Sequence, residues 1–426
     1  MAIFYGTRGV DIMVGTNGSD VISGGNGDDL LVGDKFLFNP PNEISPTIGN
    51  DVIYGGAGND IIVGDIQIYS GLLDSYSDLS SPYVPTWFNG NAGLYGGSGG
   101  DSIFGVYQVG IFTASTITLD FGPQPIPTPQ TAPQPMEFLY GEQGNDLLVG
   151  NAGYGANIFD DHAYIINMFV EHLSSYLDGG AGDDILSGGC LISVITAQNG
   201  STGDKTTLNF ESSKLIGGNG NDILYGSDKE YNIIISNNSH FTNFKTVFGG
   251  DIMDGGNGMD AIYGDVGILK IDIDNTSSLD GVLQLGGDHI DGGNGNDTIF
   301  GDVGSFDLHG ITLAQLGNMI TTSQGDTING GNGTDFIAGQ FGNDVLTGGQ
   351  GPDTFAYFSQ ITNGNDIITD FNIMKDALQG DHAGMFSDGG HDSSGNLIIN
   401  IADATGHSTI TLLGVSDFSN VHTFIV

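Results

Sequence analysis

Apolar residues recur along most of the chain in short, evenly spaced groups, each of which follows a cluster of glycines. In the first three groups Asp11, Asp20 and Asp29 are followed by Ile-Met-Val, Val-Ile-Ser and Leu-Leu-Val, so the second residue of each group is apolar. Because the side chains of a strand alternate between its two faces, one apolar side chain of each group can point into a narrow core. The pattern predicts many short strands joined by glycine turns.

The glycines and the apolar groups belong to one nine-residue unit, Gly-Gly-x-Gly-x-Asp-x-apolar-x. Thirteen full copies begin at residues 6, 15, 24, 55, 96, 141, 179, 217, 255, 292, 330, 339 and 348. Partial copies end in residues 50–54, 250–254, 287–291 and 325–329. Between residues 141 and 330 the full copies are 37 or 38 residues apart, which adds a longer repeat in the middle of the chain. Fixed periods of this kind indicate a solenoid.

Each longer period contains an insertion of about 20 residues between a full and a partial nonapeptide. Apolar and polar residues alternate in insertion segments such as 268–274, which favours strand over helix. An insertion of this length suits either a protruding hairpin or an extra, degenerate coil, and both remain open. The insertion at 66–93 is rich in aromatic residues and is a candidate partner-binding loop, whereas residues 122–135 hold six of the twelve prolines and predict an extended spacer.

Composition and charge exclude several other classes of protein. The 426 residues include 73 Gly, and 51 acidic residues stand against 8 Lys and Arg, which gives a net charge of −43. A basic face is needed to bind nucleic acid or an anionic membrane, so neither partner is expected. With 38% hydrophobic residues the chain is too apolar for a disordered acidic tail. A hard cation is therefore expected to neutralise the carboxylates when the chain folds.

The nonapeptide has the chemistry of a calcium-binding turn. Glycines at its first, second and fourth places permit a tight turn with left-handed backbone angles, in which carbonyl oxygens converge. The Asp adds a carboxylate, and Ca²⁺ accepts six to eight oxygen ligands, including backbone carbonyls. Stacked coils of two units each would bind Ca²⁺ between successive turns. In a metal-free solenoid the same stacking would bring unpaired carboxylates together, and they would repel one another.

These repeats resemble those of RTX proteins, the secreted calcium-binding β-rolls of bacteria. The resemblance implies an all-β fold, a right-handed parallel β-roll or β-solenoid over residues 1–358. It also implies a set of Ca²⁺ ligands: Asp11, Asp20, Asp29, Asp51, Asp60, Asp101, Asp146, Asp184, Asp222, Asp251, Asp260, Asp288, Asp297, Asp326, Asp335, Asp344 and Asp353. The insertions interrupt the tandem array usual in the family, so we expect broken columns of sites and on the order of 8–14 Ca²⁺.

The segment 359–426 lacks nonapeptides and is predicted to be a C-terminal β cap. It also resembles the uncleaved secretion signal of type I secretion substrates, although Thr423 stands where an acidic residue is common. The N-terminus has no basic region followed by an apolar stretch, and no apolar run is long enough to span a bilayer. The expected location is extracellular, at or beyond the cell surface, after export without an N-terminal signal peptide.

No catalytic constellation is evident, so we expect a non-enzymatic protein. A Gly-x-Ser-x-Gly pattern at 96–100 lies inside a nonapeptide rather than at a strand-to-helix elbow, and Glu171–His172 lacks the second His of a zinc motif. Repeats begin by residue 6 and leave no room for a catalytic domain before them. An uncapped first coil invites end-to-end self-association into a filament or matrix, which predicts a structural or adhesive role. The alternative is a secreted factor that binds a host or carbohydrate partner through its insertions.

Overall fold

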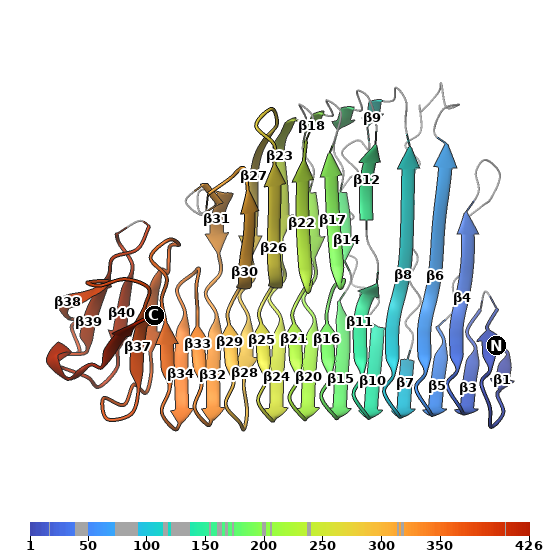
Figure 1. The fold of residues 1–426 in the computed structure, drawn as a ribbon, viewed down its shortest axis with the longest axis horizontal. Helices are drawn as coiled ribbons and strands as arrows, with labels where there is room; N and C mark the ends of the chain where they lie inside the picture. Colours follow the sequence, from blue (N-terminus) through green and yellow to red (C-terminus); the bar gives the residue numbers. More distant parts are fainter. Residues whose placement is uncertain are drawn as a thin grey trace.

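The computed structural model is a solenoid of parallel β-strands that ends in a small antiparallel cap (Figure 1). The all-β fold with parallel solenoid sheets is therefore confirmed. The structure describes residues 1–16, 18–38, 50–72, 93–113, 118–120, 137–152, 155–159, 164–166, 169–172, 174–197, 202–204, 207–236, 240–312, 315–316, 319–404 and 406–426. The aromatic side chains of the segment 66–93 and the proline-rich segment 122–135 lie outside the described residues.

Sheet A has 15 strands and forms one side of the solenoid. Its strands, in spatial order, are β1 (Ile3–Tyr5), β3 (Val21–Asn26), β5 (Val52–Ala57), β7 (Gly93–Ser98), β10 (Glu137–Gln143), β15 (Ser175–Ala181), β20 (Lys214–Asn219), β24 (Ile252–Asn257), β28 (His289–Asp291), β32 (Thr327–Asn332), β34 (Val345–Gln350), β36 (Asn365–Ile368), β40 (Thr409–Leu412), β39 (Leu397–Ile401) and β38 (Phe386–His391). Each strand from β1 to β36 pairs in parallel with the equivalent strand of the next coil, as Ile22 does with Ile53.

Sheet B forms the opposite side of the solenoid. In the nonapeptide tier it contains β2 (Ile12–Val14), β4 (Leu30–Phe38), β6 (Ile61–Leu72), β8 (Ser102–Thr113), β11 (Leu147–Ala152), β16 (Ile185–Ser187), β21 (Ile223–Tyr225), β25 (Ala261–Tyr263), β29 (Thr298–Phe300), β33 (Phe336–Ala338), β35 (Thr354–Ala356), β37 (Ala377–Gly380) and β41 (Thr423–Ile425). In the insertions it continues as β12 (Gly155–Phe159), β17 (Ile192–Ala197), β22 (Glu230–Ile235), β26 (Val266–Ile273) and β30 (Val303–His309).

The insertions form a second tier, drawn above the nonapeptides in Figure 1. Ile192 of β17 lies opposite Glu230 of β22, which lies opposite Ile268 of β26. The return segments contribute to sheet C, which consists of β9 (Thr118–Asp120), β13 (Tyr164–Ile166), β14 (Phe169–His172), β18 (Thr202–Asp204), β19 (Thr207–Phe210), β23 (His240–Val247), β27 (Ser278–Leu285) and β31 (Ile320–Ser323). The described insertion strands pair with those of adjacent coils, so each insertion widens its own coil and is neither a protruding hairpin nor a separate coil.

Two hydrophobic cores run along the two tiers. In the nonapeptide tier the apolar residue of each unit points inward, and Ile22, Leu31 and Ile53 have none of their surface exposed. This is the narrow core that the sequence pattern predicts, with one side chain from sheet A and one from sheet B in each coil. A separate cluster that includes Ile233, Leu269 and Ile271 fills the insertion tier. Full burial of one such side chain contributes about 1.5–3 kcal/mol, so both tiers stabilise the stack.

The C-terminal region begins as solenoid and ends as a cap. The expected boundary at residue 358 falls between β35 and β36, yet β36 and β37 continue sheets A and B in parallel for one more coil. Strand β40 then pairs in parallel with β36, whereas β39 and β38 add antiparallel strands at this end. A 3-10 helix, η1 (Phe418–Asn420), precedes the last strand, β41. Among the described residues, no helix has both the length and the hydropathy to cross a membrane.

Candidate metal sites

The turns that lead from sheet A to sheet B are complete nonapeptide turns, and we call them the continuous turns; Gly24–Asp29 between β3 and β4 is an example. Their Asp residues form a column along the solenoid, in which the backbone N–H of each Asp donates to Oδ1 of the Asp one coil further on, over 2.7–3.1 Å. The members of this column are Asp11, Asp29, Asp60, Asp101, Asp146, Asp184, Asp222, Asp260, Asp297, Asp335, Asp353 and Asp376.

Glycine is required in these turns by the backbone. In the turn of Asp29, Gly25 and Gly27 have φ angles of 105° and 116°, a region that side chains with a Cβ rarely enter. A Cβ on Gly25 or Gly56 would also collide with a backbone carbonyl oxygen of the preceding coil. The spacing of the glycines therefore sets both the turn and the close stacking of successive turns.

The turns that lead back from sheet B to sheet A contain the insertions, and we call them the split turns. In one of them Gly264 and Asp288 are the first and last residues, with the insertion between them. The two ends nevertheless meet as in a continuous turn: a Cβ on Gly264 would collide with Asp288 Oδ2, as a Cβ on Gly24 would with Asp29 Oδ2. Two turns of this side, ending in Asp20 and Asp344, have no insertion.

The Asp column of the split side has a gap. Hydrogen bonds of 2.5–2.9 Å from backbone N–H to Asp Oδ1 connect Asp20 to Asp51, and then connect Ser213 through Asp251, Asp288, Asp326 and Asp344 to Asp366. In between, the equivalent described positions belong to Glu137, Ser175 and Ser213, and the residue that precedes Gly93 in the sequence, Ala92, lies outside the described residues. The break in the columns that the insertions predict is therefore present, but only on this side of the solenoid.

The second carboxylate oxygen of most of these Asp residues is buried and has no hydrogen-bond partner among the described residues. This holds for Oδ2 of Asp29, Asp51, Asp60, Asp101, Asp146, Asp184, Asp222, Asp251, Asp260, Asp288, Asp297, Asp326, Asp335, Asp344 and Asp353. Each of these residues is at most 3% exposed. A buried, unpaired carboxylate oxygen is costly unless a cation binds it, and stacked carboxylates beside glycine carbonyls are the oxygen donors that Ca²⁺ prefers. These fifteen predicted ligands fit calcium.

Burial also shifts the pKa of these carboxyl groups upward. It raises the pKa of Asp101, Asp222 and Asp297 to about 7, against 3.8 ordinarily, and the neighbouring Asp residues of the column add to the shift. On the split side, burial raises the pKa of Asp288 to about 8. A cation between the carboxylates would remove this repulsion and keep them ionised.

The first coil differs from the others because Thr replaces Gly at the second place of both of its units. Thr7 donates to Asp11 Oδ2 from its backbone N–H and its Oγ, at 2.6 and 3.0 Å. Thr16 donates to Asp20 Oδ2 in the same way, at 2.6 and 2.7 Å. Although burial acts to raise the pKa of Asp20, the hydrogen bonds from Ala2 and Thr16 lower it overall. Asp11 and Asp20 thus lie at the predicted positions, but their Oδ2 atoms are already satisfied.

Further buried acidic residues that the sequence did not predict as ligands lie in or beside these columns, and three of them are Asp366, Asp376 and Asp265. Asp366 follows Asn-Gly-Asn and precedes Ile-Ile, so its local sequence carried the signal of a partial nonapeptide. Asp376 extends the continuous column without any glycine before it, and only the stacking of β37 on β35 places it there. Asp265 lies at the start of an insertion and meets Asp251 and Asp288, with the carboxylate oxygens of the three residues within 4.8 Å of one another.

Comparison with protein families gives the same assignment as the geometry. The family model of the RTX calcium-binding nonapeptide repeat (4 copies) matches residues 5–36, 47–67, 137–155, 174–189, 213–228, 285–305 and 320–355. A search of curated proteins finds no significant match to the chain. RTX nonapeptide repeats bind several Ca²⁺ ions, and proteins that carry them are typically secreted. With buried Asp columns in its turns and matching segments distributed along its solenoid, the chain carries RTX calcium-binding nonapeptide repeats.

Proposed function

We propose that this protein is a non-enzymatic, secreted solenoid that folds on Ca²⁺ outside the cell and associates with further copies through its first coil, in a structural or adhesive role. The observation that carries the proposal is the contrast between the first coil, whose apolar side chains are exposed, and the opposite end, which has an antiparallel cap. Type I secretion without an N-terminal signal peptide and association with the cell surface belong to the same proposal.

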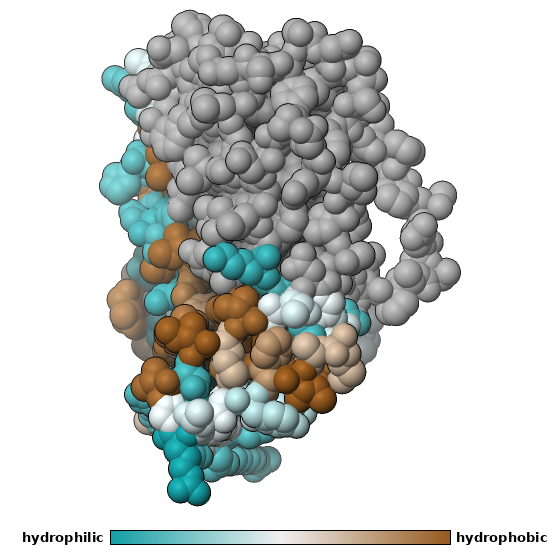
Figure 2. All heavy atoms as spheres, turned by 90° about the vertical axis from the view of Figure 1, so that its right-hand side faces the viewer, coloured by the Kyte–Doolittle hydropathy of each residue, from teal (hydrophilic) through white to brown (hydrophobic). Residues whose placement is uncertain are grey.

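The first coil presents apolar side chains and two strand edges. Strands β1 and β2 pair with β3 and β4 on one side, and on the other side the described residues offer them no strand. Tyr5 is 78% exposed, Val10 72% and Ile12 75%, and Figure 2 shows apolar residues gathered on the lower part of this end. Unpaired strand edges and contiguous apolar surface favour association with another chain.

A second copy of the chain is the occupant that best matches this face. Two first coils can meet around a two-fold axis, which satisfies the same edges and the same apolar residues on both partners. At the opposite end, β39 pairs antiparallel with β40 and β38 pairs antiparallel with β39, so the parallel pairing of sheet A ends there. The capped end of one copy therefore cannot continue the parallel strand pairing of the first coil of another copy. A dimer through two first coils is the smallest assembly that this proposal predicts.

Calcium-dependent folding supports the location outside the cell. Calcium sites of extracellular modules bind at about 10⁻⁴–10⁻³ M, so sites of this strength stay empty at cytosolic calcium concentrations. Without the ion the buried carboxylates of both columns oppose folding, and an unfolded chain suits export through a narrow channel. Once the chain meets extracellular calcium, binding and folding are coupled.

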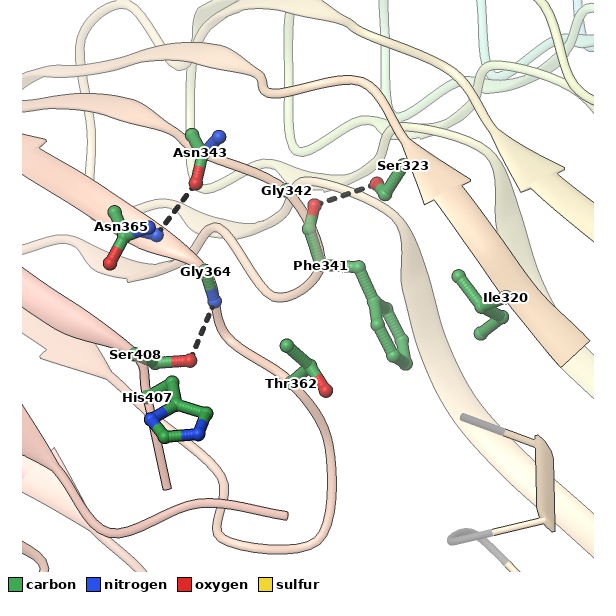
Figure 3. Close-up of a pocket in the computed structure, with 10 residues that line it drawn as sticks. All are labelled: Ile320, Ser323, Phe341, Gly342, Asn343, Thr362, Gly364, Asn365, His407 and Ser408. Carbon is green, nitrogen blue, oxygen red and sulfur yellow. Dashed lines mark hydrogen bonds between the residues drawn. The ribbon is translucent and has the colours of Figure 1, made fainter. Parts of the chain in front are cut away.

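The proposal of a non-enzymatic role concerns, among other places, the pocket between the insertion tier and the cap (Figure 3). Its serine hydroxyls are engaged by the backbone, since Ser323 Oγ donates to the Phe341 carbonyl (2.8 Å) and Ser408 Oγ accepts from Gly364 N–H (2.9 Å). His407 is the one titratable side chain among the lining residues. Among the described residues, the serine hydroxyls of this pocket are hydrogen-bonded to the backbone and not to the imidazole of His407.

The test is the mass of the protein in solution at millimolar calcium, measured by analytical ultracentrifugation over a range of protein concentrations. We expect dimers or larger assemblies of the wild type and monomers of the double variant Tyr5→Lys, Ile12→Lys. The control is Ile252→Lys, which changes a 51% exposed residue in the middle of sheet A and should assemble like the wild type. A monomeric wild type at high protein concentration would refute self-association.

A further inference from the structure

Three buried carboxylates meet where an insertion leaves the nonapeptide tier. Asp251 and Asp288 end two successive split turns, directly before β24 and β28. Asp265 follows Gly264 and is separated by that glycine from β25, so it is the first acidic residue of the insertion itself. Each residue offers a carboxylate oxygen, and these oxygens lie within 4.8 Å of one another. The exposed fractions of Asp251, Asp265 and Asp288 are 1%, 0% and 2%.

The oxygens of this cluster lack partners. Oδ1 of Asp251 and Oδ1 of Asp288 each accept one backbone N–H, whereas Oδ2 of both residues has no hydrogen-bond partner among the described residues. Among the described residues, the carboxylate of Asp265 accepts from a single donor, the N–H of Gly286, at 3.1 and 3.3 Å. The ion pairs of the described part of the chain involve other side chains. Three buried carboxylates this close together can all stay ionised only if a cation binds between them.

The position of Asp265 corresponds to a turn residue that the insertion has displaced. In a continuous turn such as Gly24–Asp29, four residues lie between the first Gly and the Asp, and their carbonyl oxygens are potential donors to an ion in the turn. In the split turn those residues are replaced by an insertion that runs away along β26. The carbonyl of Gly264 still lies beside Asp251 Oδ2, because a Cβ on Gly226 would collide with both. A carboxylate at position 265 can therefore supply oxygen ligands that the split backbone no longer offers.

We propose that Asp251, Asp265 and Asp288 together bind one Ca²⁺, with Asp265 as a ligand contributed by the insertion rather than by a nonapeptide. This inference rests on the calcium binding of the repeats and not on self-association through the first coil. Among the described residues, three carboxylates come within 4.8 Å of one another in this coil. One coil further on, Asp302 occupies the equivalent position, but its carboxylate accepts from Phe341 N–H (2.8 Å) and Ser323 Oγ (3.4 Å). The coil before has Ser227 there, whose N–H donates to the Asp265 carbonyl.

The site can be tested by locating and counting calcium ions in the intact protein. In crystals of the wild type grown with CaCl₂, an anomalous difference map at long wavelength should show a peak between the three carboxylates. In solution, native mass spectrometry should count one Ca²⁺ fewer in Asp265→Asn than in the wild type. The control is Asp272→Asn, which changes an exposed Asp of β26 in the same insertion and should keep the full count.

Two results would overturn the inference: an anomalous map without a peak between the three residues, or an Asp265→Asn variant that binds as many ions as the wild type. The map needs no variant, so it decides the matter even if Asp265→Asn does not fold. Neither measurement depends on the oligomeric state. A monomeric protein with the peak would refute the proposed self-association alone, and an assembled protein without the peak would refute this site alone.

Discussion

The continuous and the split turns are stacked along the same solenoid, but Asp occupies the last position of the turn more regularly in the continuous turns than in the split turns. On the continuous side every coil from Asp11 to Asp376 has one. Among the described positions of the split side, Glu137, Ser175 and Ser213 stand where other coils have Asp, and all three follow an insertion. The insertions pair in parallel and have a core of their own. Where packing between insertions holds adjacent coils together, a calcium ligand can be lost; where only turns are stacked, it is retained.

Removal of calcium should have the largest effect on the folded structure, because it deprives the carboxylates of both Asp columns of their counter-ions. At pH 7.5 with excess chelator we expect most of the strand signal in the far-ultraviolet circular dichroism spectrum to disappear, and millimolar Ca²⁺ to restore it. Mg²⁺ at the same concentration is the control and should restore less, because it demands octahedral geometry and dehydrates reluctantly. A spectrum that chelation leaves unchanged would show that the columns fold without metal.

The pH dependence of the calcium-free protein should be the next largest effect. Burial raises the pKa of Asp101 and Asp222 to about 7 and that of Asp288 to about 8, against 3.8 ordinarily. Between those values the folded chain holds protons that the unfolded chain has released, so the free energy of unfolding falls as the pH rises from 3.8 to about 8. Urea titrations in the presence of chelator at several pH values measure this free energy of unfolding. The Asp residues of the split column should set the upper end of the pH range over which it falls. Stability that increased with pH across this window would contradict the prediction.

Most of the fold could be predicted because the nonapeptide carries its own geometry. The glycine spacing specifies the turn, the Asp supplies the ligand, and the single apolar residue supplies the core side chain. The roles of residues such as Asp29 and Leu31 therefore follow from the amino-acid sequence alone. Asp376 has no glycine signal, and Asp265 lies outside every nonapeptide. Both are brought into place only by the stacking of coils far apart in sequence. The arrangement of the insertions escaped prediction for the same reason, since alternation identifies a strand but not its partner 38 residues away.

Single substitutions in the continuous column should show how much each of its carboxylates contributes. Asp222→Asn keeps an oxygen that can accept the Asp184 N–H but removes the charge. We expect it to lower the free energy of unfolding by about 2.7 kcal/mol when calcium is at 100 times the Kd of the site. Asp280→Asn, at an exposed position of β27, is the control for the change in net charge and should leave stability unchanged. Equal stabilities of the two variants at saturating calcium would remove Asp222 from the ligands.

Filling the gap in the split column should give a smaller effect of opposite sign. Ser213 already donates its N–H to Asp251 Oδ1 and accepts from Ser175 N–H, as an Asp of the column would. Ser213→Asp should therefore add a calcium ion and, at ten times the Kd, about 1.4 kcal/mol of stability, while it destabilises the calcium-free protein. Ser213→Asn has nearly the same shape without the charge and should show neither effect. If Ser213→Asp binds no additional calcium ion, the insertions, and not the missing carboxylate, limit the number of ions on the split side.

The smallest effect should come from a backbone conformation within the continuous column. Glu142 takes the second place of its turn, where the other continuous turns from that of Asp29 to that of Asp353 have Gly, and its φ is 73°. The left-handed region costs a residue with a Cβ about 1–2 kcal/mol, and part of this is offset because Gly gains entropy in the unfolded chain. Glu142→Gly should thus raise the free energy of unfolding by about 0.5–1 kcal/mol at saturating calcium. The reverse change one coil further on, Gly180→Ala, should lower it, because the new methyl group would collide with the Glu142 carbonyl. A loss of stability in Glu142→Gly, accompanied by the loss of an ion, would instead identify the Glu142 carboxylate as a calcium ligand and make this turn the exception in its column.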